Sequence, residues 1–364
     1  MSRIAITGMG LHTSFGKGIA ENWKEVLFPD HRPSSNDGLL QGYERTKELA
    51  FSAVQEALQQ AGLGALPQRR ALDAERIGCT FSASKPLFTQ ENAVVSPGVL
   101  THDIQVRFEL RGESRTVIAA CATGAYSLAL AGSWIEQNLC DVVIAGSVEP
   151  RPHPLMAAGF ARLGVLSAEA VMRPFDAARS GFVFGEGAGA IILESPAHAA
   201  ARGARILVWL SGWGCGEDAH SAVAFNSGGR RIADVVGKAL AKARLSPSDI
   251  GHVNAHGTAT RLNDALETQA LHKAFGSHAA RLKISATKST TGHLLGAAGS
   301  VEFILTALAL RDQQVPPTAH LTTQDAACDL DYTREHAQPL VFEHAVSLSF
   351  GFGGPIGALV ASRC

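Results

Sequence analysis

The run SRTVIAACATGAYSLALAGSWIEQNL, residues 114–139, decides the fold of this chain. β-Branched residues at 116–118 give way to an Ala- and Leu-rich stretch that predicts a helix from about Ala122. This helix carries no charge until Glu136, so both of its faces must be covered by protein. Cys121 lies at its start, where free N–H groups and the positive end of the helix dipole favour a thiolate. A lone cysteine is more often a small buried residue than a nucleophile, so other stretches must decide between these interpretations.

Composition and charge limit the class of protein. With 364 residues, 46% of them hydrophobic, the chain can bury a large core as two domains or one duplicated domain. The 32 Lys and Arg nearly balance the 33 Asp and Glu, which argues against nucleic acid or an anionic membrane as the main partner. Six cysteines without paired spacing are typical of reduced thiols and argue against disulfides and zinc. We find no signal peptide or membrane-spanning run and expect a soluble, cytoplasmic protein.

The hydrophobic pattern predicts an α/β fold whose element order occurs twice. In the first half, a strand, a buried helix and a continuous apolar strand form a βαβ unit. From about residue 202 a similar order begins again, so we predict two halves, 1–202 and 203–364. The strands are expected at 3–10, 141–146, 190–194, 206–210, 253–254, 283–285 and near 346 and 358, and the helices at 21–27, 43–61, 122–136, 231–243 and 297–310.

Two further expectations concern the first half. Residues 84–113 show no clear period and predict irregular structure with a short helix at most. Arg45 and Lys47 are placed on the polar side of the helix over 43–61, where a solvated face is a better interpretation than a docking site for an acidic carrier. The glycines at 8–10 lack the third glycine of a dinucleotide fingerprint, because position 13 is Thr.

Three loops of the second half carry polar residues among glycines: NAHGTAT at 254–260, KSTTGH at 288–293 and SFGFGG at 349–354. Loops that follow strand ends are where α/β sheets bind ligands. His256 and His293 could ligate a metal, but no third ligand is evident in sequence, so hydrogen bonding to a carbonyl is preferred. A thiolate with two imidazoles suits acyl transfer through a thioester.

These stretches, with AACATG at 119–124 and LLGAAG at 294–299, resemble the elongating β-ketoacyl-acyl carrier protein synthases over nearly the whole chain. The resemblance implies an α/β thiolase fold with two pseudo-duplicated halves in five α-β-α-β-α layers. It also implies an acyltransferase that condenses malonyl-acyl carrier protein, with loss of carbon dioxide, onto an acyl group held on Cys121. The pathway would be fatty acid, polyene or polyketide biosynthesis.

The same resemblance implies a role for each matched residue. Cys121 is the nucleophile, its N–H and that of Phe352 form the oxyanion hole, and Phe352 is also a gate. His256 and His293 bind the thioester carbonyl of the malonyl group. The other matched positions are Lys288, which orders the site, its ionic partner Glu302, the arm-binding Thr258 and Thr260, and the structural anchors Asp264 and Glu267.

The implied partner is acyl carrier protein, whose phosphopantetheine arm carries the substrates, with no other cofactor and no metal. A homodimer is expected, and a heterodimer with a ketosynthase-like subunit is the alternative. The chain departs from the family pattern in a short 84–113 region, in Ser180 for Asp, and in Pro355-Ile356 for Thr-Asn.

Two rival functions remain. A chain-length-factor-like subunit would shape the pocket of a partner, but such subunits usually lack the cysteine that stands here at 121. A thiolase would need a second cysteine near the C-terminal motif, and residues 349–351 offer none, while Cys364 is at the chain end.

Overall fold

The computed structural model describes residues 3–29, 42–64 and 73–364. The elements of the first half are β1 (Ile4–Thr13), β2 (Gly16–Lys17), α1 (Ile19–Leu27), α2 (Gly42–Gln60), η1 (Ala74–Arg76), β3 (Ile77–Ser82), β4 (Leu87–Phe88), β5 (Val94–Val95), α4 (Pro97–Phe108), η2 (Ala120–Ala122), α5 (Thr123–Glu136), β6 (Val142–Glu149), α6 (Pro154–Arg162), β7 (Gly187–Glu194) and α7 (Pro196–Ala201).

The elements of the second half are β8 (Val208–Glu217), α8 (Arg230–Ala243), η3 (Pro247–Asp249), β9 (His252–Asn254), α9 (Arg261–Phe275), η4 (Gly276–Arg281), β10 (Lys283–Ser285), α10 (Lys288–Thr291), η5 (Leu295–Ala297), α11 (Ala298–Asp312), β11 (Gln314–Val315), β12 (Gln338–Pro339), β13 (His344–Phe350) and β14 (Pro355–Ser362). Here η denotes a 3₁₀ turn.

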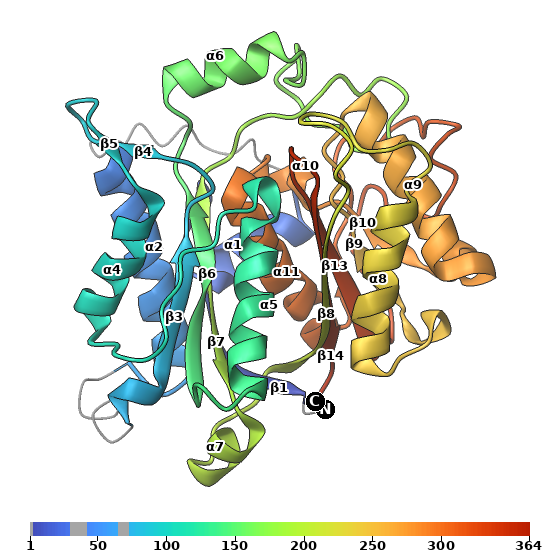
Figure 1. Cartoon of the computed structure of the whole chain (residues 1–364). Coiled ribbons are helices and arrows are strands. Elements are labelled where there is room, and N and C mark those ends of the chain that lie inside the picture. Colours follow the sequence, from blue (N-terminus) through green and yellow to red (C-terminus); the bar gives the residue numbers. More distant parts are fainter. Residues whose placement is uncertain (1–2, 30–41, 65–72) are drawn as a thin grey trace.

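The expected five layers are present (Figure 1). Helices α2 and α4 cover one outer face, α8 and α9 cover the other, and α5 and α11 fill the centre. The strands follow the order β10-β9-β13-β14-β8-β1-β7-β6-β3, with β2 paired to β1. A short antiparallel contact between β1 and β8, from Ile4 to Ile6, joins the strands of the two halves.

The two halves repeat each other in topology. In the first, β3 pairs parallel with β6, β6 antiparallel with β7, and β7 antiparallel with β1. In the second, β9 pairs parallel with β13, β13 antiparallel with β14, and β14 antiparallel with β8. In the second half, β10 pairs parallel with β9 at the edge of the sheet. The corresponding contact in the first half is the parallel bridge between Cys79 of β3 and Ser114. The repeated element order that the sequence predicts is therefore a repeated pairing pattern.

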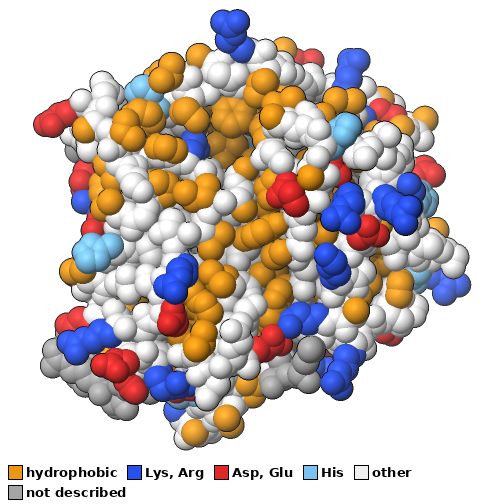
Figure 2. Space-filling model, in the orientation of Figure 1, with side chains coloured by type: hydrophobic (Ala, Val, Ile, Leu, Met, Phe, Trp, Pro, Cys, Tyr) orange, Lys and Arg blue, Asp and Glu red, His pale blue; other side chains and the backbone are white. Residues whose placement is uncertain are grey.

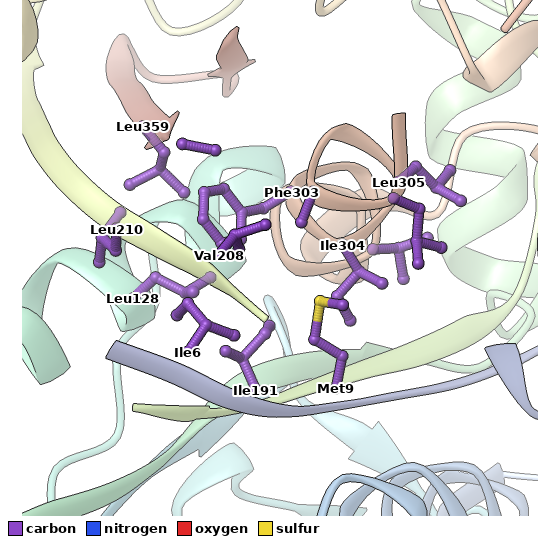
Figure 3. Packing of buried hydrophobic residues seen from close by; sticks show 14 of the residues in the cluster. Ile6, Met9, Leu128, Ile191, Val208, Leu210, Phe303, Ile304, Leu305 and Leu359 are labelled. Atoms are coloured by element: carbon purple, nitrogen blue, oxygen red, sulfur yellow. The ribbon is translucent and has the colours of Figure 1, made fainter. Parts of the chain in front are cut away.

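The central helices are buried as the uncharged sequence requires. Every residue from Ala298 to Leu310 of α11 is buried, and side chains of α5, α11 and the strands around them point toward one another (Figure 3). The two helices meet at glycines. A Cβ on Gly124 would lie 2.3 Å from the backbone nitrogen of Ser300, and one on Gly299 would lie 2.5 Å from that of Ala125. Side chains at these positions would force the helices apart.

The expectation for residues 84–113 is wrong. The segment contains a β-hairpin, β4 with β5, and a helix of 12 residues, α4, which packs on β3. Ser96 caps the helix, since its hydroxyl accepts from the N–H of Gly98, and Pro97 occupies the first turn. Leu100, Ile104 and Phe108 form its buried side.

The placement of Arg45 on a solvated face is also wrong. Its guanidinium is buried and contacts Glu186 at 2.6 Å and Glu48 at 2.7 Å. Glu186 is itself buried and lies 141 residues further along the chain. Lys47, by contrast, is half-buried and pairs with Glu44 on the same helix.

Among the helices of the described ranges, none has the length and apolar character needed to cross a bilayer.

Candidate active site

Cys121 lies where an extended segment turns into the buried helix α5. The turn is the 3₁₀ segment η2, and Ala120 in it has a φ of 47°, a left-handed conformation that is unusual for a residue other than glycine. Cys121 is 8% exposed and packs in a cluster with Phe182 and Leu295. The tight turn presents the cysteine at the end of the helix, beside the loops of the second half.

His256 follows β9 in a loop that a carboxylate holds in place. Glu267 accepts hydrogen bonds from the backbone N–H groups of His256 (2.6 Å) and Gly257 (2.8 Å). The imidazole Nδ1 lies 3.3 Å from two donors, the N–H of Phe350 and the ammonium of Lys288. Because Nδ1 accepts, the ring proton is on Nε2.

His293 has the same arrangement. It follows the short helix α10, and its Nδ1 accepts from the N–H of Leu295 at 3.3 Å, which again leaves the proton on Nε2. The ring lies 5.6 Å from that of His256 and 4.9 Å from that of Phe182, at nearly perpendicular angles.

Both imidazoles are held neutral. Burial lowers the pKa of His256 and of His293 well below the usual value, and the positive charge of Lys288 lowers both further. A neutral ring with its proton on Nε2 is a hydrogen-bond donor. The pair can therefore donate two hydrogen bonds to one oxygen without either ring carrying a charge.

Lys288 and Glu302 form a buried ion pair behind His256. Neither side chain is more than 1% exposed, and the ammonium lies 2.6 Å from the carboxylate. Burial raises the pKa of Glu302 to about 7, and the ammonium opposes that shift. Lys288 does not line the cavity described below, so it acts on His256 and not on a bound molecule.

The thiol of Cys121 differs from the sequence prediction of a thiolate. Burial raises its pKa to about 12, and the lowering effects of Lys288 and Lys85 are smaller. Burial is the largest effect on the pKa of this thiol. In the resting protein the sulfur is therefore a neutral thiol.

This difference can be measured by alkylation with iodoacetamide from pH 6 to 10. We expect the rate at Cys121 to rise by about tenfold per pH unit without a plateau, because the reactive thiolate is a small fraction throughout. Peptide mass mapping separates Cys121 from the exposed Cys364, and Cys121→Ala gives the background. A plateau near pH 7 would instead show the lowered pKa that the helix start predicts.

Six of the candidate residues line one cavity of about 690 Å³. Cys121, His256, His293, Thr258, Thr260 and Phe352 are all on its wall. The hydroxyls of Thr258 and Thr260 lie 3.1 Å apart, and Thr260 also caps α9. Among the described residues, no acceptor is found for the backbone N–H of Cys121 or of Phe352, so both are available to an oxyanion.

Phe352 belongs to an aromatic group at the cavity. Its ring stacks on Phe160 of α6 at a centroid distance of 6.2 Å, and Phe160 also contacts Phe182 and Phe184. Figure 2 shows hydrophobic side chains gathered around a hollow beneath α6. Phe160 was not predicted from sequence, although its place in an apolar helix that begins at Pro154 was a usable signal.

Asp264 and Glu267 lie outside the cavity wall, beneath the loops. Asp264 accepts from the N–H of Phe175 at 2.8 Å, and Glu267 holds the 256–257 backbone. Burial raises the pKa of Asp264 to about 6 and that of Glu267 to about 7. Both contact protein groups, with no direct access to a bound molecule.

In the described part of the chain, no three His, Cys, Asp or Glu side chains are grouped as metal ligands.

Sequence reasoning missed one further group beside Cys121. Lys85 forms an ion pair with Glu149, the last residue of β6, which is fully buried. Glu149 also accepts from the hydroxyl of Ser84 (2.6 Å) and the N–H of Gly296 (3.1 Å). A carboxylate ending a continuous apolar strand was the signal that could have revealed it.

Fold and site together define a layered α/β protein in which a thiol at a helix start faces two neutral imidazole donors. The comparisons with known proteins identify the group. The N-terminal domain model of the beta-ketoacyl synthases matches residues 42–199, and the C-terminal domain model matches residues 207–322. The chain belongs to the beta-ketoacyl synthase family.

Similar proteins with established names extend along the whole chain. The 3-oxoacyl-[acyl-carrier-protein] synthase 2 of Coxiella burnetii is 30% identical over 411 residues, covering 99% of this chain and 98% of the relative. That of Staphylococcus aureus is 33% identical over 410 residues with the same coverage. These alignments are longer than the 364 residues of this chain, so the relatives hold several tens of residues that it lacks.

Solved structures of ketosynthases have the same fold as this chain. A type II PKS ketosynthase, bound to the hexaketide and in complex with its acyl-carrier protein, superimposes with a TM-score of 0.91 at 26% identity. A beta-ketoacyl synthase from Burkholderia phymatum gives 0.89 at 28%, and the ishigamide ketosynthase/chain length factor gives 0.88 at 26%. All cover 100% of this chain and 99% or more of the matched chain.

Proposed function

We propose that this chain is a β-ketoacyl-acyl carrier protein synthase that catalyses decarboxylative condensation. The observation that supports this most is the convergence of the Cys121 thiol, two neutral Nε2–H donors and two free backbone N–H groups on one cavity. Each group has a task in thioester chemistry, and the required residues come from both halves of the chain.

In the first step the sulfur of Cys121 attacks the acyl thioester of the carrier. A new carbon–sulfur bond forms, the bond to the carrier sulfur breaks, and the carrier thiol leaves with the cysteine proton. The N–H groups of Cys121 and Phe352 stabilise the oxyanion of the tetrahedral intermediate. Because the thiol starts neutral, proton loss is part of this step.

In the second step malonyl-carrier protein enters. The Nε2–H groups of His256 and His293 donate to its thioester oxygen, so the carbon–carbon bond to the carboxylate breaks to give carbon dioxide and an enolate. The enolate carbon attacks the acyl carbon on Cys121, and the sulfur leaves and takes a proton from solvent. The product is a β-ketoacyl thioester two carbons longer, still on the carrier.

The carrier arm would enter along the cavity wall. The hydroxyls of Thr258 and Thr260 can hydrogen-bond the amide groups of a phosphopantetheine arm. Arg261 is exposed at the start of α9 and lines the same cavity, which suits an acidic carrier protein. These contacts require no other bound group.

The test is intact mass after incubation with acyl-carrier protein. We expect an acyl adduct on the wild-type protein and none on Cys121→Ala, and subsequent malonyl-carrier protein should remove the adduct. Cys215→Ala is the matched control, because that thiol is half-buried and absent from the cavity wall. A wild-type protein that forms no adduct would contradict the proposal.

The alternative role as a pocket-shaping subunit is distinguished in the same sample. We expect size-exclusion to give a homodimer, because the segment just before the nucleophile lies at the outer edge of the sheet, beside β3, and exposes 57% of Ile118. An adduct that forms only when a second ketosynthase-like protein is added would favour the heterodimer.

A further inference from the structure

A second cavity, of about 420 Å³, lies beside α6 and the β4–β5 hairpin. Part of its wall is apolar, formed by Pro86, Leu87, Phe88, Pro150, Pro152, Pro154 and Met156. The rest combines uncharged polar groups with five charged side chains, Arg45, Lys85, Glu149, Arg151 and Glu186. A cavity with both characters fits a molecule that has an apolar body and a charged end.

This cavity adjoins the active site through the Lys85–Glu149 pair. Glu149 accepts from the N–H of Gly296, and the neighbouring Leu295 packs against Cys121 and donates to His293. The charge of Lys85 reaches both Cys121 and His293, lowering the pKa of each. Helix α6 forms a second connection.

On α6, Met156 lines the second cavity, and Phe160, one turn later on the same side of the helix, lines the first. The helix crosses the top of the molecule, and none of its residues is fully buried (Figure 1). The two cavities are therefore neighbours along one turn of α6.

The charges of the second cavity do not cancel. Lys85 is paired with Glu149, and Arg45 is paired with Glu186 and Glu48. Arg151 is exposed on the cavity wall, and among the described residues its guanidinium has no acidic partner. The wall thus carries one cation that is available to an anion from outside the chain.

We propose that this cavity binds the distal end of the acyl chain on Cys121, and that the chain ends in a carboxylate held by Arg151. The inference rests on the proposed function and adds to it the class of acyl substrate. The proline and leucine side chains would cover the methylene groups, and the planar guanidinium can bind a carboxylate through two hydrogen bonds.

The test compares two pantetheine thioesters of equal carbon number, one ending in a methyl group and one in a carboxylate. The rate of adduct formation on Cys121 is followed by intact mass with the full chain. We expect the carboxylate-ended chain to load faster by about tenfold, the size of one charge-assisted hydrogen bond. The preference should shrink at high ionic strength, because Arg151 is exposed.

Two variants make the test specific. Arg151→Gln should abolish the preference, whereas Arg281→Gln, an exposed arginine of η4 on neither cavity wall, should keep it. Equal or faster loading of the methyl-ended chain by the wild type would overturn this inference while supporting the proposed function. A preference that survives in Arg151→Gln would also overturn it. If neither chain loads, both the inference and the proposed function fail.

Discussion

Replacing Glu302 with leucine should lower the free energy of unfolding by about 3–5 kcal/mol, the cost of leaving one member of a buried ion pair without its partner. Lys288 has no exposed surface, and its ammonium lies 2.6 Å from the carboxylate that the substitution removes. Urea unfolding followed by circular dichroism measures the loss. The matched control is Asp331→Asn at the Lys283–Asp331 pair, whose side chains are 30% and 45% exposed. There we expect less than about 1 kcal/mol.

The double variant Lys288→Met, Glu302→Leu separates stability from activity. Because an apolar pair of similar volume can replace a buried ion pair, most of the lost stability should return. Activity should not return, since Nδ1 of His256 loses one of its two donors. Loss of the cation also raises the pKa of His256, so the acid limb of the condensation rate should move to higher pH than in the wild type. A Glu302→Leu variant as stable as the wild type would contradict the predicted cost of breaking this buried pair.

The sequence predicted the position of the candidate site well, because its polar residues follow the ends of strands. The 254–260, 288–293 and 349–354 loops follow β9, β10 and β13, which are neighbours in one sheet, so their polar residues had to meet. Burial of the helix after Cys121 followed from its lack of charge. The sequence revealed the repeat of the two halves only as a repeated element order. The halves share the direction of their strand pairing but have no readable sequence identity.

Two of the errors have a common cause, which is that they concern contacts between residues far apart in the sequence. Arg45 has the pattern of a solvated helix face, but Glu186 reaches it from a loop far along the chain. The predicted thiolate at Cys121 rested on the local helix start, whereas the packing of Phe182 and Leu295 around the thiol decides its pKa. The helix α4 is different, because Ser96 and Pro97 gave a local start signal that the weak period of the segment obscured.

The last prediction concerns the proton on His293. If the ring acts as a neutral Nε2–H donor, His293→Leu should lower the condensation rate by about 10²- to 10³-fold, the loss expected for one donor to a developing oxyanion. His293→Gln should recover a large part, because its amide nitrogen can occupy a position close to that of Nε2 and donates without titrating. Loading of Cys121, which uses the backbone N–H groups instead, should continue in both variants.

This comparison distinguishes a hydrogen-bond donor from a general base. The Nδ1 atom of His293 already accepts a hydrogen bond from the N–H of Leu295, so a general base would have to accept its proton at Nε2. The amide nitrogen of glutamine could not take over that role. Single-turnover release of carbon dioxide from malonyl-carrier protein, measured separately from adduct formation on Cys121, gives both rates. Equal loss in the leucine and glutamine variants would contradict the donor role. Loss of Cys121 loading in both variants would instead place His293 in the acyl-transfer step. That outcome is not expected, because burial lowers the pKa of His293 and makes the ring a weak proton acceptor.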